Sequence, residues 1–277
     1  VTDGGAGVSI TAASALVLGT VNANSLALIT DGAITQTGAV TVATSTTVDA
    51  DGDNDGTDSA VTLTNASNNF SGAVSVTDGG AAVSITDTDA FDLGTMNAVS
   101  LTVNAGDVTQ SGVLSVSGAT SVTSSGSVTL ANASNDFDND DSGDGVTVSG
   151  TSVSVTDVDN LVLNVTSSTG DSSVVAGGTL VLSAASVAGN LSLTSDGAIT
   201  QTGAMSVTGT TAIDADGDND GTDSAVTLTQ AANDFSGAVS VTDGGAAVSI
   251  TDASALVLGT VNANSLTLIT DGAITQS

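Results

Sequence analysis

The sequence predicts an all-β protein, a parallel β-helix (β-solenoid) whose coils are about 20 residues long. Three observations predict this fold: long internal repeats, short runs in which apolar and polar residues alternate, and the absence of proline, which cannot donate to a strand ladder. Tandem antiparallel sandwiches are the alternative. They need longer strands, domains of about 100 residues and aromatic anchors, whereas this chain of 277 residues has four Phe and no Trp or Tyr.

The repeats divide the chain into blocks. Residues 1–37 and 241–277 align without a gap and differ at four positions. A second copy starts at Val76, and a more diverged copy starts at Val146. We expect one continuous solenoid segment over 1–277, because self-similarity of this kind is typical of stacked repeats. Its super-repeats are 1–75, 76–145, 146–240 and a partial 241–277.

The unequal lengths of the blocks indicate the length of one coil. From the start of a block to its Asp-Gly-Ala-Ile-Thr-Gln segment, the chain runs for 30 residues in the first and last blocks but for 50 in the third. A solenoid accommodates insertions of whole coils most readily, because only these keep the inward residues facing inward. The difference of 20 residues therefore predicts a coil of about that length.

Alternating runs indicate which residues line the interior. In Val8–Thr11 and Ala60–Thr64, every second residue is apolar, and alternate side chains of a strand point to opposite faces. The expected interior includes Val8, Ile10, Leu16, Leu18, Leu26 and Leu28. Three of the four Phe follow an Asn-Asn or Asn-Asp pair, and we expect them to fill corners of the coils. They are Phe70, Phe137 and Phe235, and we expect the fourth, Phe91, in the core.

The charge of the chain excludes several classes of function. The 30 acidic residues are all Asp, and with no Lys, Arg or His the formal net charge is −30. Catalysis near neutral pH usually relies on His, Lys, Cys, Tyr or a tuned Glu, all of which are absent, so we expect no enzyme. Nucleic acids and anionic membranes would be repelled. No apolar run approaches the ~20 residues of a membrane-spanning helix.

Two Asp-rich loops have the spacing of a calcium-binding turn. Both contain Asp-x-Asp-x-Asp-Gly, the first half of an EF-hand loop, in which alternate carboxylates surround one Ca²⁺ and Gly permits a sharp turn. The match is partial, because Thr62 and Thr227 occupy the position of the bidentate Glu. Oxygen ligands favour Ca²⁺ over transition metals; a solvated acidic turn is the alternative. The candidate ligands are Asp49, Asp51, Asp53, Asp55 and Asp58 in the first loop and Asp214, Asp216, Asp218, Asp220 and Asp223 in the second.

A third acidic cluster follows Phe137. It adds Asp138, Asp140 and Asp144 as candidate metal ligands. Because this cluster has no Gly at the sixth position, it matches the calcium loop less completely than the other two.

Several segments of the sequence resemble the repeats of filamentous-haemagglutinin-like bacterial exoproteins. They are DGAITQTGAV, NASNNFSGAVSV, QAANDFSGAVSV and VSITDASALVLG. The resemblance covers nearly the whole chain. It implies a right-handed parallel β-helix, an extracellular or cell-surface location, and a role in adhesion, aggregation or surface filaments. The implied partners are other copies of the protein or the surface of a host or neighbouring cell. The resemblance carries no catalytic residues.

Two further expectations follow from the repeats. An ice-binding or carbohydrate-binding module is the alternative function, with Thr pairs such as Thr62 and Thr64 or Thr227 and Thr229 on a flat face. It needs an uninterrupted column of Thr, whereas the outward positions here mix Ser, Thr, Asn and Gln.

Because the chain begins and ends in one phase of the repeat, we expect it to be part of a longer chain; separate subunits stacked end to end are the alternative.

Overall fold

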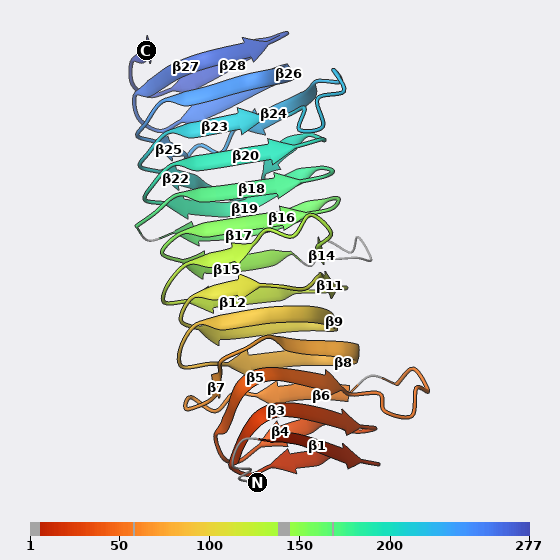
Figure 1. Ribbon diagram of the computed structural model, residues 1–277. Coiled ribbons are helices and arrows are strands. Elements are labelled where there is room, and N and C mark those ends of the chain that lie inside the picture. Colours follow the sequence, from red (N-terminus) through yellow and green to blue (C-terminus); the bar gives the residue numbers. More distant parts are fainter. Residues whose placement is uncertain (1–5, 58, 138–144, 168) are drawn as a thin grey trace. The chain divides into compact units, whose positions relative to one another are not determined.

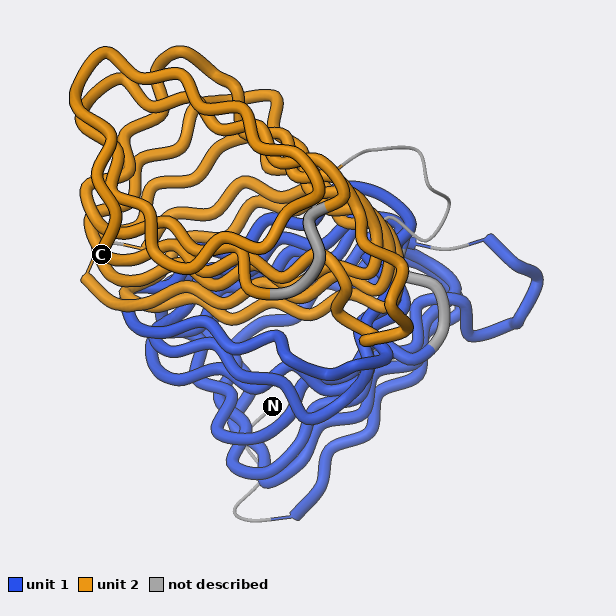
Figure 2. Tube along the Cα trace, turned by 90° about the horizontal axis from the view of Figure 1, so that it is seen from above, with its two compact units in different colours: residues 1–144 blue, residues 145–277 orange. Residues whose placement is uncertain are grey.

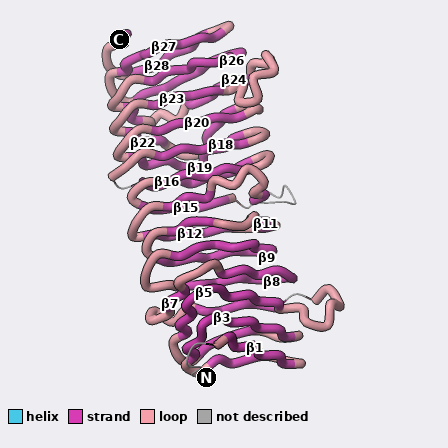
Figure 3. The backbone as a smooth tube through the Cα atoms, viewed as in Figure 1, coloured by secondary structure: helices cyan, strands magenta, loops and turns pink. Residues whose placement is uncertain are grey.

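The computed structural model describes residues 6–57, 59–137, 145–167 and 169–277, which form strands and turns (Figure 3). No helix occurs among them, and hence none long and apolar enough to cross a membrane. The chain divides into two compact units, Val1–Asp144 and Gly145–Ser277, which are coloured separately in Figure 2. Within each unit, short strands stack from one coil to the next (Figure 1).

Unit 1 contains the strands β1 (Gly7–Ala12), β2 (Leu16–Leu18), β3 (Val21–Thr30), β4 (Ile34–Gln36), β5 (Val40–Asp49), β6 (Ser59–Leu63), β7 (Asn69–Phe70), β8 (Val74–Thr86), β9 (Phe91–Ala105), β10 (Val108–Gln110), β11 (Leu114–Val116), β12 (Thr120–Ser124), β13 (Val128–Leu130) and β14 (Asp136–Phe137).

Unit 2 contains the strands β15 (Val146–Gly150), β16 (Val153–Asp157), β17 (Leu161–Ser167), β18 (Ser172–Ala176), β19 (Leu180–Val187), β20 (Leu191–Ser195), β21 (Ile199–Gln201), β22 (Met205–Val207), β23 (Thr211–Asp214), β24 (Ser224–Leu228), β25 (Asp234–Phe235), β26 (Val239–Asp252), β27 (Leu256–Ala263), β28 (Leu266–Thr270) and β29 (Ile274–Gln276).

The strands of each unit pair in parallel with strands of the neighbouring coils, which confirms the predicted solenoid. In unit 1, Val8 of β1 faces Leu26 of β3. In unit 2, Val153 faces Ser172, which in turn faces Leu191, so the chain returns to the same column at equal steps. These steps are close to the predicted coil length, and the insertion in the third block corresponds to one additional coil.

Among the described residues, each unit contains a coil that is longer than the steps given above. Thr46 faces Val74 and Thr211 faces Val239, and the two offsets are equal and clearly longer than that from Val153 to Ser172. The additional residues form an Asp-rich loop and an Asn-containing turn outside the ladder. These insertions leave the inward positions in phase, because the ladder resumes with the same face buried on both sides of the loop.

The core is the column of apolar side chains that alternation predicts. Leu18, Leu26 and Leu28 are buried. Phe70 and Phe91 pack edge to face with ring centroids 6.2 Å apart, and Phe137 and Phe235 are also buried, which confirms the predicted corner and core positions. Three of the predicted interior residues are partly exposed, Val8 and Ile10 of β1 and Leu16 of β2.

A pair of side-chain amides, one from a buried Asn and one from a half-buried Gln, recurs at three corners. Gln36 Nε2 donates to Asn68 Oδ1 at 2.8 Å, and Asn68 Nδ2 donates back to Gln36 Oε1 at 2.9 Å. The three Asn are fully buried, so their polar atoms would destabilise the fold if they were unpaired. The other two pairs are Gln110 with Asn135 and Gln201 with Asn233.

Each Asn of these pairs also hydrogen-bonds the backbone. Asn68 Oδ1 accepts from Val40 N at 2.9 Å, and its Nδ2 donates to Leu63 O at 2.9 Å and to Thr86 O at 3.1 Å. One side chain thus joins three consecutive coils. The sequence-based prediction concerned only the Phe two residues later. The recurrence of Thr-Gln-x-Gly upstream of each Asn-x-Phe was the signal for the pair.

Candidate metal centre in the two aspartate loops

Two loops of matching conformation carry most of the predicted ligands. One joins β5 to β6, and the other joins β23 to β24. Asn54 and Asn219 have φ angles of 55° and 56°, and Gly56 and Gly221 have φ angles of 80° and 82°. Gly adopts this left-handed region freely and Asn tolerates it, so the Asp-Gly-Asp-Asn-Asp-Gly sequence can turn back sharply.

Each loop brings three carboxylates together. Asp51, Asp53 and Asp55 each offer one oxygen atom, and these oxygens lie within 4.8 Å of one another. The corresponding group in unit 2 consists of Asp216, Asp218 and Asp220. A cluster of carboxylate oxygens at this spacing can hold a metal ion, and oxygen is the ligand atom that Ca²⁺ and Mg²⁺ prefer.

The first Asp of each triplet anchors its loop. Asp51 is only 4% exposed, and its two carboxylate oxygens accept from Asp55 N at 3.2 Å and Gly56 N at 2.9 Å. Asp216 is buried to the same extent and makes the same two hydrogen bonds with Asp220 N and Gly221 N. The carboxylates that follow, two and four residues later, are exposed. The cluster therefore has a fixed inner ligand and two outer ligands.

A fourth carboxylate reaches each loop from the preceding coil, and the sequence-based prediction missed it. A Cβ atom on Gly52 would lie 2.9 Å from Oδ1 of Asp31, and one on Gly217 would lie 2.7 Å from Oδ1 of Asp196. Each of these two Asp precedes the first Asp of its triplet by 20 residues. The predicted coil length was the signal that could have located them.

A buried hydroxyl next to this fourth carboxylate fixes the corner of the coil. Thr30 Oγ1 donates to Ser14 O at 2.6 Å, and Ser195 Oγ donates to Gly178 O at 2.6 Å. Both hydroxyls thus bridge to the coil before their own. Asp31 and Asp196 follow them directly in the sequence, so their backbones are held where two coils meet.

Desolvation and like-charge repulsion raise the pKa of several loop carboxyls. At Asp53 desolvation is the largest cause, and repulsion from the other carboxylates of its loop adds to it, against a hydrogen bond from Asp55 N that lowers the pKa. The pKa of Asp196 and that of Asp216 are raised mainly by desolvation as well, with further repulsion from their neighbours. The chain contains no cationic side chain to compensate, whereas a divalent ion would.

Some predicted ligands lie beside the triplets. Asp49 Oδ1 accepts from Asp51 N at 3.2 Å, and Asp214 Oδ1 accepts from Asp216 N at 3.2 Å, so both support the start of the loop. Asp223 is exposed. Four predicted ligands lie outside the described residues: Asp58, Asp138, Asp140 and Asp144.

The outward Thr positions form mixed columns. In unit 1, Thr62 faces Ser84, which faces Thr102, which faces Ser121. In unit 2, the column that contains Thr227 begins with a Val. Its members are Val162, Val181, Thr200, Thr227, Ser249 and Thr267. These columns lack the uniform Thr spacing that an ice-binding face needs.

A protein-family model described as "Repeats of unknown function (DUF5649)" matches residues 5–77, 80–142, 169–242 and 245–277. These segments make up most of the chain. No curated protein and no solved structure matches the chain.

Proposed function

Because the chain belongs to the family of repeats of unknown function (DUF5649), we propose that it is a structural repeat protein whose stacked coils form a stiff extracellular scaffold, adhesive or filamentous, at the cell surface. The observation that carries this proposal is the parallel ladder within each unit, where strand after strand pairs at a spacing of one coil. Repeats stacked in this way give an extended surface from a small repeating unit.

The charge of the chain supports a scaffold more than an enzyme or a nucleic-acid binder. No Lys, His or Cys is present to act as a base or to activate Ser or Thr. A net charge of −30 would repel nucleic acids and anionic lipids. The partners that we propose are other copies of the protein or the surface of another cell, as the resemblance to adhesive exoproteins implies.

Immunogold electron microscopy of intact producing cells would test the location and the role together. Antibodies raised against this chain should label the cell surface and any filaments that project from it. Permeabilised cells provide the control for antibody access. Labelling that appears only after permeabilisation would contradict the proposal.

We further propose that the scaffold binds Ca²⁺ in its two Asp loops. The ligands in unit 1 would be Asp51, Asp53 and Asp55 with Asp31 from the preceding coil, and those in unit 2 would be Asp216, Asp218 and Asp220 with Asp196. The donors are all oxygens, which suits a hard divalent cation. The ion would stabilise the fold because it would remove the repulsion between carboxylates of two consecutive coils.

Thermal unfolding with and without Ca²⁺ tests this site. EDTA should lower the melting temperature and excess Ca²⁺ should restore it, because a ligand at 100 times its Kd stabilises the native state by about 2.7 kcal/mol. The double variant Asp31→Asn, Asp196→Asn should bind Ca²⁺ about tenfold more weakly.

Asp171→Asn is the control, since Asp171 is exposed, accepts hydrogen bonds from Asn190 N and Nδ2, and belongs to neither Asp triplet. This variant should leave the affinity for Ca²⁺ unchanged. A melting temperature that does not respond to chelation at low salt would show that the loops are solvated acidic turns.

A further inference from the structure

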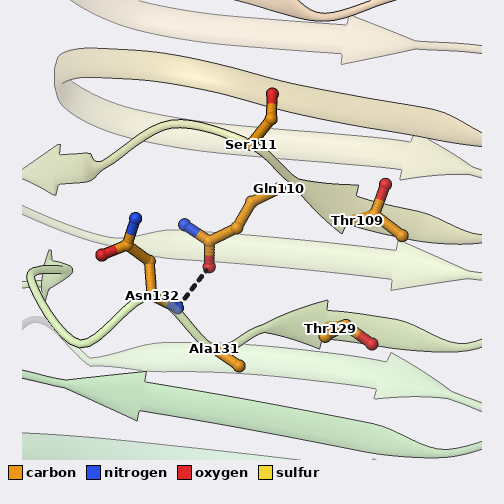
Figure 4. A pocket seen from close by; sticks show the side chains of 6 residues that line it. All are labelled: Thr109, Gln110, Ser111, Thr129, Ala131 and Asn132. Atoms are coloured by element: carbon orange, nitrogen blue, oxygen red, sulfur yellow. Dashed lines mark hydrogen bonds between the residues drawn. The ribbon is translucent and has the colours of Figure 1, made fainter.

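An open groove of about 410 Å³ lies between two consecutive coils of unit 1 (Figure 4). Thr109, Gln110 and Ser111 form one wall. The groove exists because two paired strands separate here. β10 and β13 pair at Val108 and Val128, and beyond Val128 the chain leaves the ladder. It then enters a turn in which Asn135 N donates to Asn132 O at 3.1 Å. The residues of the other wall are Thr129, Ala131 and Asn132.

One of the amide pairs links the two walls of the groove. Gln110 Oε1 accepts from Asn132 N at 3.2 Å and from Asn135 Nδ2 at 2.9 Å, and Gln110 Nε2 donates to Asn135 Oδ1 and Gly112 O. Asn135 is fully buried. The two walls are therefore kept at a fixed separation before any ligand arrives, which lowers the entropic cost of binding.

A strong hydrogen-bond acceptor lies next to the first wall. Asp92 pairs in register with Thr109, and its Oδ2 accepts from the Ser111 hydroxyl at 2.9 Å. Its other carboxylate oxygen, Oδ1, is buried and has no hydrogen-bond partner among the described residues. This oxygen does not line the groove. The wall itself offers a ligand the Ser111 hydroxyl oxygen, which can accept a hydrogen bond because its proton is donated to Asp92.

We propose that this groove binds a neutral saccharide. Its walls present hydroxyls, amides and the methyl groups of Thr and Ala, which match the hydroxyls and C–H faces of a sugar ring. An anion would find no cationic side chain anywhere in the chain and would be repelled by its net charge. A flat aromatic ligand would find no ring on which to stack, because none of the lining residues is aromatic.

The corresponding split in unit 2 shows how one residue controls access to the groove. Gln230 occupies the position of Asn132, since its N donates to Gln201 Oε1 as Asn132 N donates to Gln110 Oε1. Gln230 Nε2 also donates to Thr202 O at 3.0 Å, so this side chain reaches from one wall to the other. The shorter Asn132 also donates across the groove, but to Gly112 O at 3.4 Å, while its Oδ1 accepts from Ser134 N. It therefore leaves the groove open in front of Ser111, the equivalent of Thr202.

Chemical-shift mapping of the labelled chain with maltose, cellobiose and lactose would test this inference, and the assay does not depend on the calcium site. At least one disaccharide should shift the amide resonances of residues 109–111 and 129–132. Asn132→Gln, which copies Gln230, should weaken this binding about tenfold or more and leave the melting temperature unchanged, since the pair of Gln110 with Asn135 stays intact. Gln230→Asn should produce new shifts at residues 200–202.

Three outcomes would overturn the inference. The first is that no disaccharide shifts these resonances at millimolar concentration. The second is that Asn132→Gln binds as tightly as the unchanged protein. The third is that glucuronate or a neutral Gly-Ser peptide produces the same shifts as the disaccharides, which would show that the groove does not select neutral sugars.

Discussion

The three buried Asn side chains are the polar residues on which the fold depends most. Asn68 makes hydrogen bonds with a side chain and with backbone groups of three coils, and no part of it is exposed. Its role could not be read from local sequence alone, because the partner, Gln36, lies 32 residues away. The apolar neighbour Phe70 was predictable, because a large hydrophobic residue next to a turn signal needs no knowledge of a distant partner.

Replacing Asn68 with Ala should destabilise the protein by about 2–4 kcal/mol, because it leaves Gln36, Val40 N and two carbonyl groups without their partner. Urea denaturation followed by circular dichroism would measure the free energy of unfolding. Asn22→Ala is the control: Asn22 is exposed on β3, and its loss should cost less than about 0.5 kcal/mol. Equal effects of the two substitutions would contradict the assigned role of the amide pairs.

The turns between strands are tightly packed against neighbouring coils. A Cβ atom at Gly72, in the turn between β7 and β8, would lie 1.3 Å from Thr44 O, which is backbone and cannot move aside. Gly19, between β2 and β3, has no atom within 4 Å of that position. The local sequence does not distinguish the two glycines. At Gly72 the nearest atom belongs to another coil, and at Gly19 no atom of any coil is close enough to contact a Cβ.

The substitution Gly72→Ala should therefore cost about 3 kcal/mol or more, as a severe case of overpacking. Gly19→Ala should change the free energy of unfolding by less than about 1 kcal/mol. Thermal and urea unfolding of the two single variants would measure the contrast. A stable Gly72→Ala protein would mean that the coil can shift to make room.

The Asp loops show where prediction from sequence succeeded and where it stopped. The Asp-x-Asp-x-Asp-Gly spacing predicted that Asp51, Asp53 and Asp55 lie together, and their carboxylate oxygens do lie within 4.8 Å of one another, because alternate residues of a tight turn converge locally. Asp49 was also selected, but it caps the start of the loop. Asp31 was missed, because the loop motif covers residues of one coil only; the predicted coil length of about 20 residues, which separates Asp31 from Asp51, was the signal for it.

At the scale of the whole chain, the architecture was predictable and the enlarged coils were not. Alternation and repeats indicate a parallel stack, because a one-residue slip would turn apolar side chains outward. The long offset between Thr46 and Val74 combines a loop and a turn that leave the ladder and return to it. The average coil length does not predict at which residue the chain rejoins the ladder after such a loop or turn.

The absence of cationic side chains should make this protein more stable as the pH falls from neutral towards about 4. The pKa values of Asp53, Asp87, Asp196 and Asp216 are raised, each chiefly by desolvation. A raised pKa in the folded state contributes stability below the pKa of the unfolded chain, and this stability is lost as the pH rises through the folded value. Asp107 has the opposite effect on stability. Hydrogen bonds from the Ser127 backbone and hydroxyl lower its pKa, so its contribution to stability is lost as the pH falls.

Melting curves in EDTA at low ionic strength would show a higher melting temperature at pH 4.5 than at pH 7.5. Added NaCl should narrow the difference, because salt screens repulsion between exposed carboxylates. A melting temperature that falls on acidification, as is usual for proteins with salt bridges, would mean that hydrogen bonds such as those of Asp107 outweigh the repulsion.

The buried Asn side chains also determine how large a piece of the molecule can open at once. In a stack held only by contacts between adjacent coils, unfolding can begin at a free end and advance by single coils. Asn68 hydrogen-bonds to the coil before its own and to the coil after it, so detaching either coil leaves a buried polar atom of Asn68 unpaired, at a cost of about 1–3 kcal/mol. Fraying that reaches Asn68 therefore meets an additional cost, which favours the release of three coils together over the release of one coil at a time.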